Sequence, residues 1–316
     1  MSFRVAILDD YQEVAARLLG PLGDGVEVVV FHDHVVDEDE VVARLAAFDA
    51  VVAMRERTPF LARVLERLPS LRLLVTTGMS NASIDLEAAA RAGVVVCGTG
   101  ARGSSTGELT IGLIVGLARG IPQEDAALRA GRWQTTVGIG LAGKTLGVLG
   151  LGRIGAQVAT VGRALGMDAV AWSENLTDAR ASEVGVRRAE SLHDLLEDSD
   201  VVTIHLRLSE RTRGLLGRGE LAVMKPTALL VNTSRGPIVD EGALVDALTA
   251  GGIAGAALDV FDEEPLPPGH PLLTTPNTVL TPHLGYVVDD NYAEYFADAA
   301  EDVRAFLAGE PVRVLA

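Results

Sequence analysis

The sequence predicts an α/β protein built from two doubly wound parallel sheets. Short runs of β-branched and aliphatic residues alternate with amphipathic stretches along all 316 residues. Most of these runs are continuously apolar, as expected for parallel strands that are buried on both faces. Alternation of strands and helices is typical of right-handed crossovers, and therefore of doubly wound sheets. A chain of this length is expected to form about two domains.

The predicted strands, in chain order, are Val5–Leu8, Val26–Phe31, Ala50–Val52, Leu71–Thr76, Val94–Cys97, Thr145–Leu149, Asp168–Trp172, Val201–Ile204, Ala228–Val231, Gly255–Leu258 and Thr278–Leu280. The predicted helices between and after them include Tyr11–Leu19, Val41–Phe48, Ser105–Gly120, Ile154–Leu165 and Val287–Leu307. The acidic run at residues 37–40 suits a helix start, because acidic side chains favour the positive end of the helix dipole.

The domain boundary is predicted from a glycine-rich linker at residues 98–104, which precedes a long apolar helix. We expect one domain over residues 101–285. The other domain is expected to comprise residues 1–100 together with 286–316, because the last helix follows the final strand and returns to the first domain.

Composition excludes several classes of protein. Apolar residues make up 48% of the chain and charged residues 22%, which excludes a disordered or fibrous protein. The net charge of −16 argues against nucleic acid and anionic membranes as partners. The N-terminus lacks the pattern of a signal peptide. The single cysteine, Cys97, excludes an internal disulfide and a multi-cysteine zinc site. We therefore expect a soluble cytoplasmic protein without a metal ion.

The strongest motif is Gly150-Leu-Gly-Arg-Ile-Gly155, which directly follows one predicted strand and opens the next predicted helix. In this context it matches the dinucleotide-binding fingerprint. Gly150 allows a tight turn, Gly152 lets the backbone approach a pyrophosphate, and Gly155 allows close packing of helix and strand. The helix N-terminus is expected to bind the pyrophosphate.

An acidic residue about 20 positions after the fingerprint would hold the ribose hydroxyls of the cofactor. The predicted strand there ends at Trp172 and is followed by Ser173 and Glu174, so one of these two residues occupies that position. Glu174 would repel a 2′-phosphate, and the nearest basic residue downstream is Arg180. This pattern favours NAD over NADP.

Three charged side chains, Arg235, Glu264 and His283, each follow a different predicted strand. Ligands bind at this carboxyl edge in open α/β sheets. An arginine offers a planar fork to a substrate carboxylate. A histidine exchanges a proton near neutral pH, and a carboxylate orients and charges it. The alternative is a structural ion pair of Arg235 and Glu264, with His283 as an ordinary loop residue.

The motifs resemble those of the D-isomer-specific 2-hydroxyacid dehydrogenases, the family of D-glycerate, hydroxypyruvate/glyoxylate and D-3-phosphoglycerate dehydrogenases. The resemblance covers nearly the whole chain and rests on the segments Leu146–Gly155, Met224–Ala228, Val231–Glu241, Ala257–Leu266 and Thr281–Gly285. It implies a flavodoxin-like substrate domain, a Rossmann NAD-binding domain and a cleft between them. It also implies a homodimer built on the cofactor domains, with Trp133 in the dimer arm, and the alternative is a place for Trp133 in the core.

The resemblance also implies roles for individual residues. Arg235, Glu264 and His283 occupy the catalytic positions. The cofactor-binding positions are Gly150, Gly152, Arg153, Ile154, Gly155, Ser173, Glu174, Leu206, Thr212, Thr233, Ser234, Asp259 and Gly285. Among them, Asp259 is expected to bind the nicotinamide carboxamide. The substrate-binding positions are Arg55, Gly78, Met79 and Arg235.

The chain departs from the family pattern at three places. Ser173 stands at the usual position of the ribose-binding acid, and Leu109 replaces a histidine near a helix start. The loop after Met79 has two extra residues. These departures concern the cofactor ribose and the substrate, and they leave the reaction type unchanged.

The predicted function is hydride transfer between NAD and a D-2-hydroxy acid or its 2-oxo acid partner. One alternative is formate oxidation on the same fold, in which relatives carry glutamine at the position of Glu264. Another is a dinucleotide-sensing binding protein without turnover. The remaining histidines are expected in less specific settings, with His32 and His34 in a solvated acidic loop and His193 and His270 in polar turns.

Overall fold

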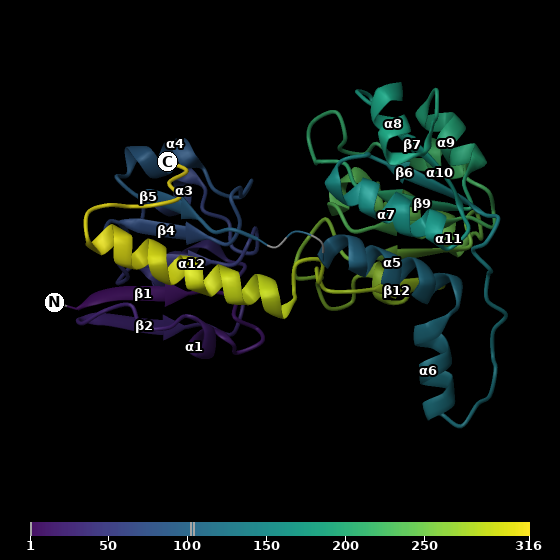
Figure 1. The fold of residues 1–316 in the computed structure, drawn as a ribbon. Coiled ribbons are helices and arrows are strands. Elements are labelled where there is room, and N and C mark those ends of the chain that lie inside the picture. Colours follow the sequence, from purple (N-terminus) through teal and green to yellow (C-terminus); the bar gives the residue numbers. More distant parts are fainter. Residues whose placement is uncertain (1, 102, 104) are drawn as a thin grey trace. The chain divides into compact units, whose positions relative to one another are not determined.

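The computed structural model describes residues 2–101, 103 and 105–316. Met1 lies outside the described residues, as do Arg102 and Ser104 of the predicted linker. The chain forms two compact units, residues 1–103 with 288–316 and residues 104–287. Each unit is an α/β fold on a sheet of parallel strands, as Figure 1 shows. The predicted fold class is therefore confirmed.

The first unit contains a five-stranded sheet in the order β2-β1-β3-β4-β5. Its strands are β1 (Phe3–Ile7), β2 (Val26–Val30), β3 (Ala50–Ala53), β4 (Leu73–Thr76) and β5 (Val95–Gly98). This is the flavodoxin-like order, in which the strand order reverses between β1 and β3. Ligands of such sheets bind near the carboxyl ends of these two strands.

Helices cover both faces of this sheet (Figure 1). They are α1 (Ala15–Leu18), α2 (Glu38–Leu45), α3 (Ala62–Leu65), α4 (Leu86–Arg91) and α12 (Asp289–Leu307). Buried side chains of α2, α3 and α4 form one core cluster with the strands. The long helix α12 packs on β4 and α1, so the end of the chain completes this unit. Asp37 caps α2 by accepting the N–H groups of Asp39 and Glu40.

The second unit contains a seven-stranded sheet in the order β12-β11-β10-β9-β6-β7-β8. Its strands are β6 (Thr145–Leu149), β7 (Asp168–Trp172), β8 (Arg187–Arg188), β9 (Val201–Ile204), β10 (Leu229–Asn232), β11 (Gly255–Leu258) and β12 (Thr278–Leu280). This is the Rossmann order extended by one strand, and it reverses between β6 and β9. The expected ligand crevice therefore lies at the carboxyl ends of β6 and β9.

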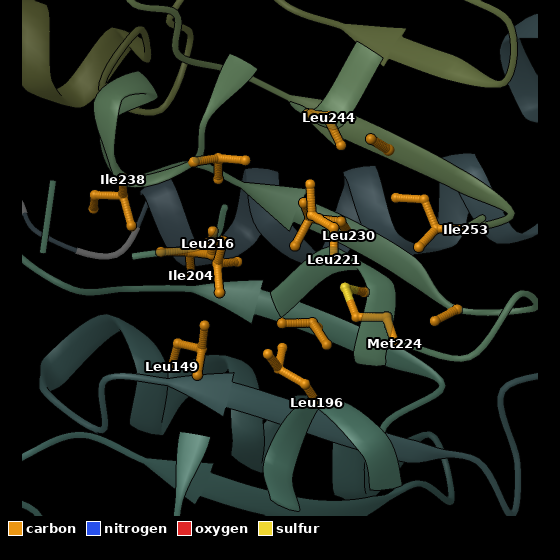
Figure 2. Close-up of a cluster of buried hydrophobic side chains, with 14 of the residues drawn as sticks. Leu149, Leu196, Ile204, Leu216, Leu221, Met224, Leu230, Ile238, Leu244 and Ile253 are labelled. Carbon is orange, nitrogen blue, oxygen red and sulfur yellow. The ribbon is translucent and has the colours of Figure 1, made fainter. Parts of the chain in front are cut away.

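The helices of this unit are α5 (Ser105–Ala118), α6 (Ile121–Arg129), α7 (Arg153–Ala164), α8 (Asp178–Val184), α9 (Leu192–Asp198), α10 (Arg218–Val223) and α11 (Glu241–Thr249), with the 3₁₀ turns η1 (Gly236–Ile238) and η2 (Pro271–Leu273). Figure 2 shows the core on one face, where Leu196 of α9, Leu221 of α10 and Leu244 of α11 meet strand residues such as Leu230. Helices α5, α7 and α8 cover the other face. Helix α6 extends away from the body of the unit (Figure 1).

Some predicted elements need correction. Helix α1 begins at Ala15 rather than Tyr11, because the Asp10 carboxylate accepts the N–H groups of Val14 and Ala15 and so holds the preceding loop.

The His32–His34 segment is not a simple solvated loop. His34 Nδ1 lies 2.8 Å from Asp9 Oδ1, and the His34 side chain is only 9% exposed. Among the described residues, no helix is long and apolar enough to cross a membrane.

Candidate active site

The glycine-rich turn after β6 contains glycines of two kinds. Gly150 has a φ of +96°, and a Cβ there would lie 2.7 Å from the His205 carbonyl oxygen. A Cβ on Gly155 would lie 2.0 Å from the Gly150 carbonyl oxygen. Backbone therefore packs on backbone at both positions. A Cβ on Gly152, in contrast, would meet nothing within 4 Å.

The open space beside Gly152 lies at the start of α7, where Gly152 is the N-cap residue and no side chain caps the helix. The first N–H groups of a helix have no partner within it, and they carry the positive end of the helix dipole. An anion fits this position, and a pyrophosphate is the anion expected from the fingerprint. The residues present therefore fit a dinucleotide.

The end of β7 has more charged side chains around it than the sequence indicates. Ser173 is half-buried, whereas Glu174 is exposed and lies 3.9 Å from Arg211. Arg180 Nε donates to the Leu151 carbonyl oxygen within the glycine-rich turn, at 3.2 Å. The structure thus adds Arg211, which is distant in sequence, to Arg180 among the guanidinium groups around the glycine-rich turn and the end of β7.

Four more of the predicted cofactor residues, Leu206, Thr212, Thr233 and Ser234, lie in loops after neighbouring strands. The Ser234 hydroxyl, after β10, donates to the Leu206 carbonyl oxygen after β9. The Thr233 hydroxyl meets that of Thr110 on α5, at 2.8 Å in a buried position. Thr212 lies further along the loop after β9, where its hydroxyl donates to the Arg207 carbonyl oxygen at 2.7 Å.

Arg235 follows β10 in a turn that the Asn232 side chain shapes. Asn232 is fully buried, and its Nδ2 donates to the Arg235 carbonyl oxygen at 2.9 Å. The guanidinium of Arg235 donates through Nη1 to the Ser234 carbonyl oxygen at 2.7 Å. The next residue, Gly236, touches the loop after β11, because a Cβ there would lie 2.1 Å from the Phe261 carbonyl carbon. Gly236 therefore holds the Arg235 turn against the start of the loop that carries Glu264.

Glu264 and His283 form a close pair. His283 Nδ1 lies 2.6 Å from Glu264 Oε2, and the side chains are 21% and 30% exposed, respectively. Glu264 Oε1 accepts the N–H of Phe261 at 2.9 Å, so both carboxylate oxygens are engaged. The Tyr286 ring packs edge-on against the imidazole, with centroids 5.3 Å apart. This arrangement fixes the ring and leaves Nε2 on the edge opposite the carboxylate.

Asp259 holds the segment that contains His283. Its carboxylate is fully buried at the end of β11 and accepts the N–H groups of Leu284 at 2.7 Å and Gly285 at 2.9 Å. It also accepts the Thr281 hydroxyl at 2.6 Å. Burial raises the pKa of Asp259, and these three donors oppose that rise. A carboxylate has about four acceptor positions, so one remains for a further donor.

In the first unit, the predicted substrate residues Arg55 and Gly78 lie together. Arg55 Nη1 donates to the Thr77 carbonyl oxygen at 3.0 Å, and a Cβ on Gly78 would overlap this nitrogen at 1.9 Å. Met79 is 52% exposed. Leu109 of the second unit, the departure near a helix start, packs against the core cluster of α5 and α7.

Some residues of the site region are not predicted from the sequence. His205 follows β9 at the ligand crevice, but burial lowers its pKa to about 3, so it stays neutral at physiological pH. The backbone N–H of Phe261 and the Tyr286 ring hold the Glu264–His283 pair, and neither follows from a motif. Among the described residues, no group of three or more histidine, cysteine, aspartate or glutamate side chains has the geometry of a metal site.

Comparison with known proteins identifies the family. Residues 111–285 match the family model described as "D-isomer specific 2-hydroxyacid dehydrogenase, NAD binding domain". The chain belongs to the D-isomer-specific 2-hydroxyacid dehydrogenase family. It is therefore an oxidoreductase that transfers a hydride between a nicotinamide dinucleotide and a 2-hydroxy acid or its 2-oxo acid partner, with a dinucleotide-binding domain in its second unit.

Similar proteins support this assignment over nearly the whole chain. A glyoxylate reductase from Aeropyrum pernix is 43% identical over 78% of this chain and 76% of its own length. A D-3-phosphoglycerate dehydrogenase from Methanocaldococcus jannaschii is 36% identical over 97% of this chain, which spans only 58% of that protein. A phosphoglycerate oxidoreductase structure from Vibrio cholerae has a TM-score of 0.93 and 38% identity, over 97% of this chain and 99% of that one.

Proposed function

We propose that Arg235, Glu264 and His283 carry out the family reaction in this chain, with a D-2-hydroxy acid and its 2-oxo acid as the substrate pair. The contact between His283 Nδ1 and Glu264 Oε2, at 2.6 Å, is the observation that carries the proposal. A carboxylate at this distance keeps the proton of the imidazole on Nδ1 and stabilises the imidazolium. The histidine is thereby prepared to give or take a proton at Nε2.

In the direction of reduction, Arg235 binds the substrate carboxylate through its planar fork of N–H groups. His283, as the imidazolium, donates a proton from Nε2 to the carbonyl oxygen, while its Nδ1–H stays on Glu264. In oxidation, the neutral ring accepts that proton from the hydroxyl group. When bound, the nicotinamide supplies or accepts the hydride. Formate oxidation and mere dinucleotide sensing need no acid–base pair, so the paired Glu264 and His283 favour dehydrogenation over both.

We further propose that the cofactor is NAD. Glu174 places a negative charge next to Ser173, where a 2′-phosphate would have to bind. Arg180 and Arg211 already have partners, the Leu151 carbonyl oxygen and Glu174 respectively. We expect kcat/KM to favour NADH over NADPH by roughly tenfold or more, the value of one good polar contact. Equal efficiency with the two cofactors would contradict this part of the proposal.

In this proposal, residues 1–100 and 286–316 form the substrate domain, where Arg55, Gly78 and Met79 bind substrate, and residues 101–285 form the cofactor domain.

A cytoplasmic location is also proposed. It rests on Cys97, the single cysteine, which is fully buried and has a pKa that burial raises to about 11. A thiol of this kind suits a reducing compartment and takes no part in the chemistry.

The proposed assembly is a homodimer built on α6 of the second unit. Ile121 and Leu128 of this helix are 52% and 57% exposed, and Trp133 just after it is 76% exposed. Together with neighbouring residues, they line a hollow of about 490 Å³. A second copy of the chain would cover this surface in a symmetric contact. Light scattering at micromolar concentration is expected to give the dimer mass, and a monomer mass would contradict the assembly.

Two alanine variants test the chemistry. His283→Ala is expected to lower kcat by about 10²–10⁴-fold, because it removes the proton donor, and to leave NADH binding nearly intact. His193→Ala is a matched control, since His193 also faces a carboxylate, that of Glu197 at 3.9 Å, but is 63% exposed on α9. We expect no loss of turnover in the control. Near-normal turnover in His283→Ala with every 2-oxo acid tested would overturn the proposed function.

A further inference from the structure

The loop that carries Glu264 is fastened to the start of α11 by a second histidine–carboxylate pair. His270 Nε2 lies 2.9 Å from Glu241 Oε1, and each side chain is 19% exposed. The other oxygen of Glu241 accepts the backbone N–H of Asp262 at 3.4 Å. One carboxylate therefore holds the loop at residue 262 and at residue 270, on either side of Glu264.

The tautomer of His270 follows from its second contact. His270 Nδ1 accepts the N–H of Leu272 at 3.3 Å and thereby caps the turn η2. A nitrogen that accepts an N–H carries no proton, so the proton of the neutral ring is on Nε2 and is donated to Glu241. His270 thus lies in the polar turn expected from the sequence, and both of its ring nitrogens have partners.

Charged side chains around the Glu241–His270 pair disfavour the observed position of Asp262. Burial, Glu241 and Asp240 all raise the pKa of Asp262, whereas Arg213 lowers it. The loop therefore brings a carboxylate toward two others, and repulsion among them favours its displacement. The contacts of Glu241 with Asp262 N–H and His270 hold the loop in place against this repulsion.

We propose that Glu241 and His270 are positioning residues for the acid–base pair. They hold the loop of residues 262–270 so that the Glu264 carboxylate remains on His283 Nδ1. This inference rests on the proposed function, in which that contact keeps His283 ready for proton transfer. Neither Glu241 nor His270 touches the reacting groups.

The experiment measures reduction of a 2-oxo acid by NADH across the pH range for Glu241→Ala and Glu241→Gln, each also combined with Glu264→Gln. Glu241→Ala is expected to lower kcat by roughly tenfold, less than the 10²-fold of a full 1 Å misplacement. This substitution should also move the alkaline limb of the pH–rate profile to lower pH, because His283 loses part of its contact with the Glu264 carboxylate. Glu241→Gln keeps one acceptor oxygen, so its effects should be smaller, and it serves if the alanine variant does not fold.

A matched control is Asp246→Ala, on the same helix. Asp246 pairs with Arg218 on the surface, where the two side chains are 59% and 75% exposed, and its loss should change neither kcat nor the profile. In the Glu264→Gln background, the Glu241 substitutions should move the limb no further, because the charge they position is already gone.

Two results would overturn the inference. One is a Glu241→Ala profile like that of the control. The other is a loss of kcat with an unmoved limb that is equally large in the Glu264→Gln background, as expected for a merely structural residue. Failure of the proposed function would be seen separately, as an unmoved limb in Glu264→Gln alone.

Discussion

The carboxyl edges of the two sheets each hold a fully buried aspartate whose carboxylate accepts two backbone N–H groups. In the first unit, Asp10 accepts those of Val14 and Ala15, at 3.1 and 3.0 Å. In the second unit, Asp259 accepts those of Leu284 and Gly285. The local chemistry is the same, but Asp10 anchors a short helix, whereas Asp259 anchors the segment that contains His283.

Burial and hydrogen bonding therefore do not distinguish an acid that anchors a helix from one that holds a candidate catalytic segment. Both carboxylates are held by position in a parallel sheet, where loops of neighbouring strands converge. The two aspartates differ in the backbone segment that each one holds, because only the segment held by Asp259 carries His283. Substitution of each aspartate should therefore affect different properties of the protein.

The largest expected effect comes from substituting these two aspartates. Asp259→Ala should lower kcat by about 10²-fold, because the segment with His283 loses its anchor and a small misplacement is enough for that loss. Asp10→Ala should lower the free energy of unfolding by about 0.5–2 kcal/mol, the usual value of a helix cap, and change kcat less than about threefold. Steady-state kinetics and denaturant unfolding measure the two. Equal losses of kcat in Asp10→Ala and Asp259→Ala would contradict the distinction between the two aspartates.

A second test applies the same distinction to two glycines of the turn after β6. Gly155→Ala should destabilise the protein by about 3 kcal/mol, because its Cβ meets a backbone carbonyl that cannot move aside. Gly152→Ala should change the unfolding free energy by less than about 1 kcal/mol, since its Cβ enters open space. It should instead weaken NADH binding at least tenfold by filling the position expected for the pyrophosphate. Unchanged NADH binding in Gly152→Ala would contradict that position.

The smallest expected effect concerns a third buried acid, Asp302 of α12 in the first unit. Burial raises its pKa to about 6, with Asp298 and Glu301 adding to the rise and Arg313 opposing it. An unfolded chain has an aspartate pKa of roughly 3.9, so between these values only the folded state holds the proton. As the pH falls from about 6 to about 4, the free energy of unfolding of the wild type should rise by about 1–2 kcal/mol relative to that of Asp302→Asn. Unfolding titrations at both pH values measure the gain, and a constant difference would contradict it.

The sequence predicts the fold well where strands are buried on both faces. Strands β6, β7, β9 and β11 have the bounds expected from their aliphatic runs, and so does β12, although its residues are only half-buried. Strand β8 escapes prediction because it consists of two exposed arginines, Arg187 and Arg188. Helix α6 escapes prediction because its large apolar residues, Ile121 and Leu128, are exposed and do not form the periodic stripe of a buried helix face.

The site is predicted only as far as residue type and strand position allow. Arg235, Glu264 and His283 each follow a strand, so parallel topology brings them to one edge of the sheet. Side-chain partners distant in sequence are not predictable in this way. The pairing of Glu174 with Arg211, and of Glu241 with His270, depends on loop conformations that no local pattern determines.

The proposed pairing of Glu264 with His283 in proton transfer is tested by the pH dependence of 2-oxo acid reduction by NADH, compared between wild type and Glu264→Gln. Glutamine keeps the shape of the side chain but removes the negative charge next to His283 Nδ1. The alkaline limb of kcat/KM should move to lower pH in Glu264→Gln, because a close opposite charge favours the charged form of a side chain. An alkaline limb at the same pH in both proteins would contradict the claim that Glu264 and His283 act as the acid–base pair.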